Sequence, residues 1–213
     1  TLTGVIAIVG LILRMFCKKR VKHNIGDILL GFSVLMFGMQ NMSEAVSPLR
    51  ENAAFLQLLT AFSNPLLGIL IGMAFTSVLQ SASAAVGILQ ALSVTGAIQF
   101  SAAMPIIMGI AIGAAVPVLL SALGANVDGR RTAMVYLVVE VIGVIVWAIF
   151  FYGLNALLHF SILNQVMTPF SIAMLNSLFR LIKVLALMPF INLLEKLVNV
   201  LVPERESEHI HAD

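Results

Sequence analysis

Long apolar blocks separated by short polar stretches dominate the chain, and they predict helices rather than strands. Between Asn52 and Val127 there is no Asp, Glu, Lys, Arg or His. A helix needs about 20 apolar residues to cross a bilayer, whereas membrane strands alternate apolar and polar positions over about ten residues. Lipid offers no partners to an open backbone, which favours helices. We therefore predict an all-α, polytopic membrane protein.

The same pattern divides the chain into segments. Residues 1–16 form a short apolar segment with the length of a truncated span, and we expect the chain to be part of a longer polypeptide because it begins at Thr1 inside this segment. The later residues 191–213 combine an amphipathic segment with a polar, cytoplasmic tail. Transmembrane spans are expected over about 25–42, 101–123, 133–154 and 170–190, with a helical hairpin over 65–94.

Composition and charge agree with a membrane location. Apolar residues make up 60% of the chain and charged residues 10%, well below the roughly 25% of an ordinary soluble domain. The net charge of +2 and the scattered Lys and Arg do not indicate a nucleic-acid partner. The single cysteine, Cys17, excludes an internal disulfide. The expected surroundings are a lipid bilayer.

The basic loops predict the path of the hairpin. Residues 18–23 and 130–131 carry Lys and Arg, which favours the cytoplasmic side for both. If both loops lie on the same side, the chain must cross the membrane an even number of times between them. The spans 25–42 and 101–123 supply two, and 65–94 is too short for two more. We therefore predict that 65–94 is re-entrant, entering and leaving from one side, with its tip at residues 80–83.

The hairpin tip is polar and is the first candidate site. Gln80, Ser81 and Ser83 interrupt an apolar run. A helix broken inside a membrane presents free N–H groups and about half a positive charge on one side of the break, with free carbonyls on the other. Such a tip can bind an anion and a small cation. The structural alternative is that the hydroxyls bond to the preceding turn or to a neighbouring helix.

The span 101–123 holds four helix-weakening residues, which are Pro105, Gly109, Gly113 and Pro117. One interpretation is a broken transmembrane helix with an unwound stretch that faces the hairpin and completes an ion site. The other is a packing face, because two glycines four residues apart allow helices to approach closely. The sequence does not decide between the two.

Three ionisable residues, Glu140, Arg180 and Lys183, fall inside the late spans. An unpaired charge near the centre of a bilayer costs at least about 2.5 kcal/mol. At a rise of 1.5 Å per residue, they lie about 12, 15 and 10 Å from the cytoplasmic end of their spans. We therefore expect an ion pair between Glu140 and either Arg180 or Lys183. Its role is open: structural, a proton or cation site at Glu140, or a phosphate anchor at Arg180.

Several stretches resemble the Na⁺/phosphate cotransporter family in its bacterial branch. The matching residues are Asn64-Pro65-Leu-Leu-Gly68, the run from Gln80 to Leu92, Gly109-Ile-Ala-Ile-Gly113 and Gly124-Ala-Asn126. The resemblance covers roughly residues 25–190, the transport repeat, and corresponds to the second of two inverted repeats. It implies a multi-pass protein of the cytoplasmic (inner) membrane that couples Na⁺ to inorganic phosphate in symport. It also implies substrate and ion contacts at Gln80, Ser81, Ser83, Gly109 and Gly113, with Na⁺ at the first three.

The resemblance also implies partners and leaves a second function open. The other half of the site would come from a first repeat in the same parent chain or from an antiparallel protomer, and many bacterial members carry a cytoplasmic PhoU-like domain. Departures from the family pattern place methyl groups where the family has hydroxyls or an amide, at Ala82, Ala111, Ala114 and Ala115. They motivate the alternative of a degenerate transporter that acts as a membrane scaffold or sensor. Neither Ser81 nor Ser83 has a catalytic partner nearby, so we expect no enzyme activity and no cofactor.

Overall fold

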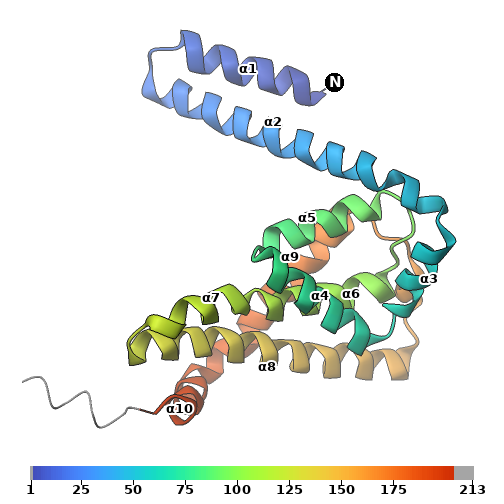
Figure 1. The fold of residues 1–213 in the computed structure, drawn as a ribbon, viewed down its shortest axis with the longest axis vertical. Helices are drawn as coiled ribbons and strands as arrows, with labels where there is room; N and C mark the ends of the chain where they lie inside the picture. The colour runs from blue at the N-terminus through green and yellow to red at the C-terminus, as the bar shows by residue number, and fades with distance from the viewer. Residues whose placement is uncertain (1, 204–213) are drawn as a thin grey trace, which may run out of the picture.

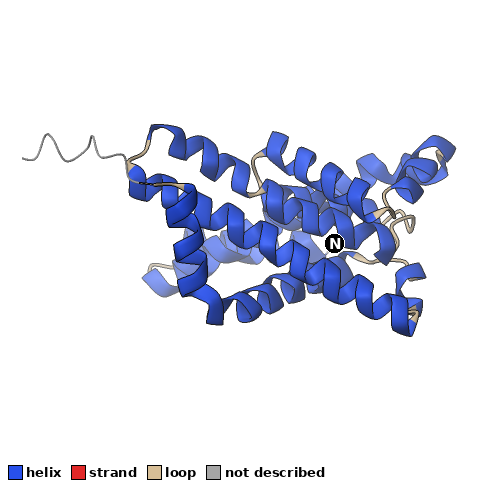
Figure 2. Ribbon diagram, turned by 90° about the horizontal axis from the view of Figure 1, so that it is seen from below, coloured by secondary structure: helices blue, strands red, loops and turns tan. Residues whose placement is uncertain are grey.

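The computed structural model describes residues 2–203, apart from the side chains at 49–50, 55 and 58–60, and this part is helical with one isolated β-bridge. Figure 1 shows the helices in chain order, and Figure 2 shows them connected by short loops. The α-helices are α1 Leu2–Phe16, α2 Arg20–Val46, α3 Ala53–Ala61, α4 Pro65–Leu79, α5 Ala82–Ser93, α6 Phe100–Gly113, α7 Ala115–Ser121, α8 Val127–Leu158, α9 Pro169–Leu187 and α10 Ile191–Leu201. Short 3₁₀ turns are η1 Ser47–Glu51, η2 Ala122–Gly124, η3 Ser161–Asn164 and η4 Met188–Phe190.

Four helical stretches in the described part are long and apolar enough to cross a membrane: 20–46, 100–124, 127–158 and 169–201. This confirms the predicted all-α, multi-span fold. The stretch 127–158 is longer than the predicted span 133–154 because Asn126 caps it early, accepting a hydrogen bond from the Gly129 amide at 2.9 Å. Arg130 and Arg131 therefore lie in the first two turns of α8 instead of in a loop. Residues 204–213 of the predicted tail lie outside the described residues.

The N-terminal helices α1 and α2 form a hairpin that extends away from the remaining helices (Figure 1). Their backbones approach closely at Gly10 and Gly26, where a Cβ on Gly26 would lie 2.8 Å from the Gly10 carbonyl oxygen. At the turn end, Arg14 forms an ion pair with Asp27, and His23 lies 3.6 Å from the same carboxylate. The hairpin thus packs through glycine and has one ion pair, between Arg14 and Asp27, near its turn.

Helices α4 and α6 pack backbone against backbone. A Cβ added at Gly72 would lie 2.2 Å from the Ile106 carbonyl oxygen, and one at Gly109 would lie 2.1 Å from that of Ile69. A Cβ added at Gly113 would likewise lie 2.6 Å from the Met73 carbonyl oxygen. No side chain fits at these positions without moving a helix. Gly109 and Gly113 therefore form a helix-packing face against α4, the second of the two interpretations of this span.

The span that contains these glycines is interrupted at Ala114. This residue separates α6 from α7 but keeps right-handed dihedral angles, φ −63° and ψ −19°. Pro105 lies inside α6 and is buried against Gly68 of α4. The span is thus broken into two helices at a single residue, and residues 100–121 contain no unwound stretch longer than this one.

The core lies where α5, α6, α8 and α9 meet. Phe179 of α9 and Phe151 of α8 both contact Trp147, with ring centroids 5.8 and 6.5 Å apart. The loops at 94–99 and 159–168 are hydrogen-bonded to each other, since the Met167 amide donates to the Ile98 carbonyl at 2.7 Å. The two loops thereby tie the end of α5 to the start of α9.

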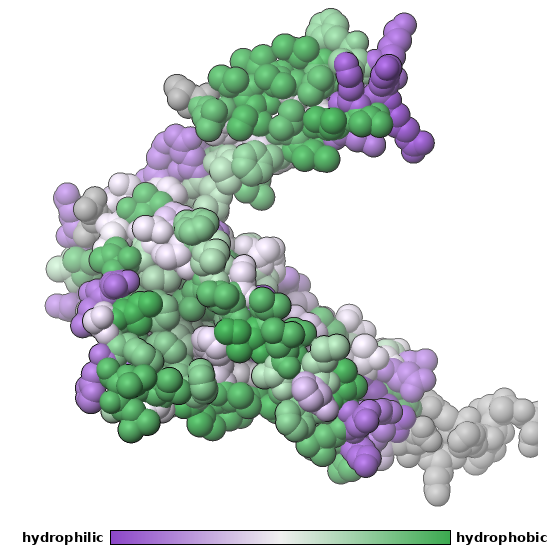
Figure 3. Space-filling view, turned by 180° about the vertical axis from the view of Figure 1, so that it is seen from behind, coloured by the Kyte–Doolittle hydropathy of each residue, from purple (hydrophilic) through white to green (hydrophobic). Residues whose placement is uncertain are grey.

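The outer surface of the helices is apolar, as lipid contact requires. Figure 3 shows hydrophobic residues covering most of one face, with polar residues gathered in a few patches at its margins. Amphipathic α10 lies against α8 through Leu194 and Val198, which are buried beside Val138. This placement agrees with the amphipathic pattern predicted after residue 190.

The close α4–α6 contact gives a direct test. Gly109→Ala should destabilise the protein by about 1–3 kcal/mol, the usual cost of forcing extra atoms into a packed interface. Gly31→Ala is the matched control, because the space around Gly31 of α2 is open and alanine favours a helix over glycine by up to about 1 kcal/mol. Thermal unfolding in detergent measures both. Equal melting temperatures for the two variants would contradict the contact.

Candidate functional site

The hairpin formed by α4 and α5, which contains the predicted tip, begins at a well-formed helix start. Asn64 adopts an extended conformation, and its side-chain oxygen accepts from the Leu66 amide at 3.0 Å. Pro65 occupies the first helical position, where a missing N–H costs no hydrogen bond. This local chemistry fixes where α4 starts. The helix then runs to Leu79, one residue before the polar tip.

The helix breaks at Gln80. This residue has left-handed dihedral angles, φ 54° and ψ 23°, and its amide donates to the Thr76 carbonyl at 2.8 Å. A non-glycine residue pays a steric cost in this region of about 1–2 kcal/mol. The turn is therefore held by its surroundings rather than favoured by the residue. It ends α4 inside the predicted 80–83 tip.

The next helix starts immediately. Ser81 is extended and caps α5, since its Oγ accepts from the Ala84 amide at 3.2 Å. The hydroxyls of Ser81 and Ser83 lie 3.3 Å apart. Gln80 and Ser83 are exposed and Ser81 is half-buried. The tip therefore presents three polar side chains at the positive end of α5 and the negative end of α4.

The predicted site residues fall into two groups. Gln80, Ser81 and Ser83 come together at the tip, whereas Gly109 lies beside Ile69 and Met73, two to three turns before the tip on α4. Gly113 is nearer, because a Cβ there would lie 2.9 Å from that of Thr76. The two glycines therefore contact α4 and not the three polar residues of the tip.

Thr76 is a residue that the sequence analysis missed. It is fully buried one turn before the break, and its hydroxyl has no hydrogen-bond partner in the described structure. It faces Gly113, directly before Ala114 and Ala115, where the family resemblance implies hydroxyl side chains. A threonine in an apolar run gives no signal from sequence alone, so its position beside the helix break is evident only from the packing.

The charged residues of the late spans form a buried ion pair. Lys183 Nζ lies 2.5 Å from Glu140 Oε2, and the two residues are 6% and 3% exposed. Arg180 is half-buried and donates to Asn176 at 3.3 Å instead. Of the two cations expected to pair with Glu140, the structure thus places Lys183 on it.

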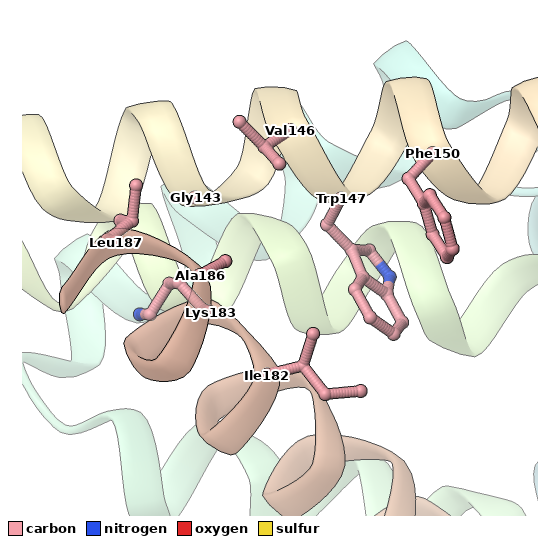
Figure 4. Close-up of a pocket in the computed structure, with 8 residues that line it drawn as sticks. All are labelled: Gly143, Val146, Trp147, Phe150, Ile182, Lys183, Ala186 and Leu187. Atoms are coloured by element: carbon pink, nitrogen blue, oxygen red, sulfur yellow. The ribbon is translucent and has the colours of Figure 1, made fainter. Parts of the chain in front are cut away.

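A glycine lets the lysine reach its partner. At Gly143 of α8 a Cβ would lie 2.3 Å from the Lys183 Cδ, so the lysine stem occupies the space where a side chain would be. Beside it a cavity of about 250 Å³ lies between α8 and α9. Figure 4 shows Lys183 and Ile182 on one wall and Trp147 and Phe150 on the other. The Trp147 indole N–H is buried and has no hydrogen-bond partner among the residues that the structure describes.

These features limit the chemistry available. The tip offers one amide and two hydroxyls, which suit a hydrated anion or a hard monovalent cation. Among the described residues there is no cluster of three His, Cys, Asp or Glu that could hold a metal ion. The cavity between α4 and α5, of about 140 Å³, is apolar. The tip therefore differs from this apolar cavity in offering exposed polar side chains to a ligand.

The fold and the site define a polytopic helical membrane protein with a capped helix break in an apolar hairpin. The profile of the Na⁺/Pi-cotransporter family matches residues 34–175. The match covers more than half of the chain, so the protein belongs to this family.

Individual relatives are more distant. The chain is 26% identical to protein YqeW of Bacillus subtilis over 94% of its own length. It is 22% identical, over 99% of its length, to YjbB of Salmonella typhimurium, a protein named for a proposed export of inorganic phosphate. The chain spans 64% of YqeW and 38% of YjbB. No solved structure matches the chain.

The ion pair predicts a pattern of stabilities. Glu140→Gln should destabilise the protein by about 3–5 kcal/mol, because it leaves the Lys183 ammonium buried without a counter-charge. Adding Lys183→Met should recover most of this loss, since an apolar pair of similar volume is often neutral or stabilising. Chemical denaturation in detergent gives both values. Glu195→Gln, an exposed change on α10, is the control and should stay within about 0.5 kcal/mol. A double variant no more stable than Glu140→Gln would show that the two charges do not interact.

Proposed function

We propose that this protein transports inorganic phosphate across the cytoplasmic membrane, coupled to Na⁺, and that residues 80–83 form half of the binding site. The observation that carries the proposal is the helix break at Gln80–Ser81, where polar side chains meet the ends of two helices. Membership of the Na⁺/Pi-cotransporter family and the name of the YjbB relatives support it.

The lack of basic residues in the hairpin supports the coupling of phosphate transport to a cation. Phosphate carries about −1.5 to −2 charges near neutral pH, by analogy with phosphoryl groups. The amide groups at the start of α5 offer only a partial positive charge, and no Lys or Arg lies between Asn52 and Val127. Na⁺ would supply the remaining positive charge. The carbonyls that end α4 and the side-chain oxygens of Gln80, Ser81 and Ser83 are suitable ligands for it.

A complete site needs a second half. Gln80 and Ser83 are exposed on this chain, and an exposed polar tip within a membrane must face protein or water. We propose that a first, inverted repeat covers it, supplied by the parent chain or by an antiparallel protomer. The re-entrant path of the hairpin is part of this proposal, as is a cytoplasmic PhoU-like domain. Rocking of one repeat against the other would give alternating access.

A specific observation favours a second function. Ala111 and Ala115 are 1% and 0% exposed, so these two positions are filled by core packing. Thr76 faces the same region with an unpartnered hydroxyl. If the cation ligands of α6 have been lost, the protein would act as a membrane scaffold or sensor. Transport measurements on the full-length protein separate the two functions.

Gln80→Gly separates folding from function at the tip. Glycine adopts the left-handed conformation without the steric cost, so the variant should be about 1 kcal/mol more stable. Its transport should nevertheless fall by about tenfold or more, the effect of losing one interaction of roughly 1.4 kcal/mol. Thermal unfolding and Na⁺-dependent movement of labelled phosphate in proteoliposomes, followed in both directions, give the two readouts.

The companion variants are Ser83→Ala and Ser63→Ala. Ser63 precedes the hairpin, and its hydroxyl lies 3.4 Å from that of Ser101, away from the tip. Ser83→Ala should weaken Na⁺-dependent transport, whereas Ser63→Ala should not. Unchanged transport in both Gln80→Gly and Ser83→Ala would remove the site assignment. Absence of phosphate movement by the unmodified protein would favour the scaffold.

A further inference from the structure

Helices α4 and α6 run side by side in the same chain direction. A Cβ at Gly68 would lie 2.4 Å from the Pro105 side chain, in the first half of both helices. One at Gly113 would lie 2.6 Å from the Met73 carbonyl oxygen, in the second half of both. Thr76, in the last turn of α4, lies against Gly113, the last residue of α6, where a Cβ would be 2.9 Å from its own. The two helices therefore end at the same level.

Several oxygen atoms at this level lack their usual hydrogen-bond donors. Thr76 is fully buried, and its hydroxyl has no partner among the residues that the structure describes. Pro117 has no N–H, so the Gly113 carbonyl, four residues before it, does not receive the hydrogen bond of a continuous helix. The carbonyls of residues 77–79 end α4, where the helix itself supplies no donors. A buried polar group in this state requires a ligand or a water molecule.

The chemistry of these groups suits a small monovalent cation. Carbonyl and hydroxyl oxygens are the ligands of hard cations, and the C-terminal end of a helix carries about half a negative charge. Between Asn52 and Val127 there is no basic side chain to bind an anion and no carboxylate to bind a divalent ion. Ala114 and Ala115, which follow α6, carry only methyl groups. The side-chain oxygen at this contact is therefore that of Thr76.

We propose that Thr76 is a binding residue for the coupling cation, and that its hydroxyl and the Gly113 carbonyl form the part of the cation site that lies between α4 and α6. This inference rests on the transport function proposed above and gives its two ligands an order. The cation binds on the α4 side of the helix break, at the negative helix end, and phosphate binds on the α5 side, at the positive end. The polar side chains of residues 80–83 lie between the two.

Thr76→Val tests the proposal in the full-length protein, because it replaces the hydroxyl by a methyl group of similar size. The variant removes an unpaired buried hydroxyl, so in K⁺ it should be at least as stable as the parent. Thr76→Ser keeps the hydroxyl. The matched control is Thr95→Val, which removes a buried hydroxyl that donates to the Leu92 carbonyl at 2.7 Å in the loop after α5. Thermal unfolding in NaCl and in KCl of equal concentration gives a readout that needs no transport.

We expect Na⁺ to raise the melting temperature of the parent, Thr76→Ser and Thr95→Val above the value in K⁺, because a bound ligand stabilises the folded state. Thr76→Val should lose this difference. In proteoliposomes, the half-saturating Na⁺ concentration for phosphate transport should rise about tenfold or more in Thr76→Val, the effect of losing one ligand. The half-saturating phosphate concentration at saturating Na⁺ should change little.

The two readouts separate this inference from the proposed function. A Thr76→Val protein with the Na⁺ response of the parent would overturn the cation site, as would a parent protein whose stability does not respond to Na⁺. A Na⁺ response that depends on the Thr76 hydroxyl, in a protein that moves no phosphate, would uphold the cation site and reject the transport function.

Discussion

The contact between α4 and α6 determines how the other elements can be arranged. Within lipid, helices gain little from hiding apolar surface from each other, so close van der Waals packing must hold them together. Glycines at 72, 109 and 113 provide it by bringing one backbone onto the carbonyls of the other. Once α4 is fixed in this way, its C-terminal end and the polar tip have a defined position. The other helix of this hairpin, α5, is positioned by its contacts in the core and by the loop pairing that ties its end to the start of α9.

Local hydrogen bonding then allows a chain reversal in an apolar run. Residue 64 caps the start of α4, and residue 81 caps the start of α5. Between them, Gln80 adopts a conformation that a side chain disfavours. A polar residue with a costly backbone conformation at the end of a helix is a common feature of functional sites, where the surrounding structure maintains the strain. Gln80 is thus both the residue at which the helix breaks and a proposed binding residue.

Much of the fold could be predicted from the sequence because lipid imposes simple rules. Apolar length predicted the spans, and Asn64-Pro65 with the polar run at 80–83 predicted a hairpin. The role of the glycines in the span 101–123 could not be predicted, since Gly109 and Gly113 suit unwinding and close packing equally. The contact with the partner helix, α4, decides between the two. The choice between Lys183 and Arg180 was equally hidden, because the two side chains lie on nearly the same face of α9. The space left by Gly143 selects the lysine.

The N-terminal hairpin has a consequence for how the protein is made. Its two helices satisfy their own backbones, contact through Gly10 and Gly26, and neutralise Arg14 with Asp27. Both of these contacts lie within residues 10–27, so α1 and α2 can pack on each other in the bilayer as soon as the two helices have been synthesised, before the spans that follow them. Assembly of the glycine-packed core can then follow as a separate step.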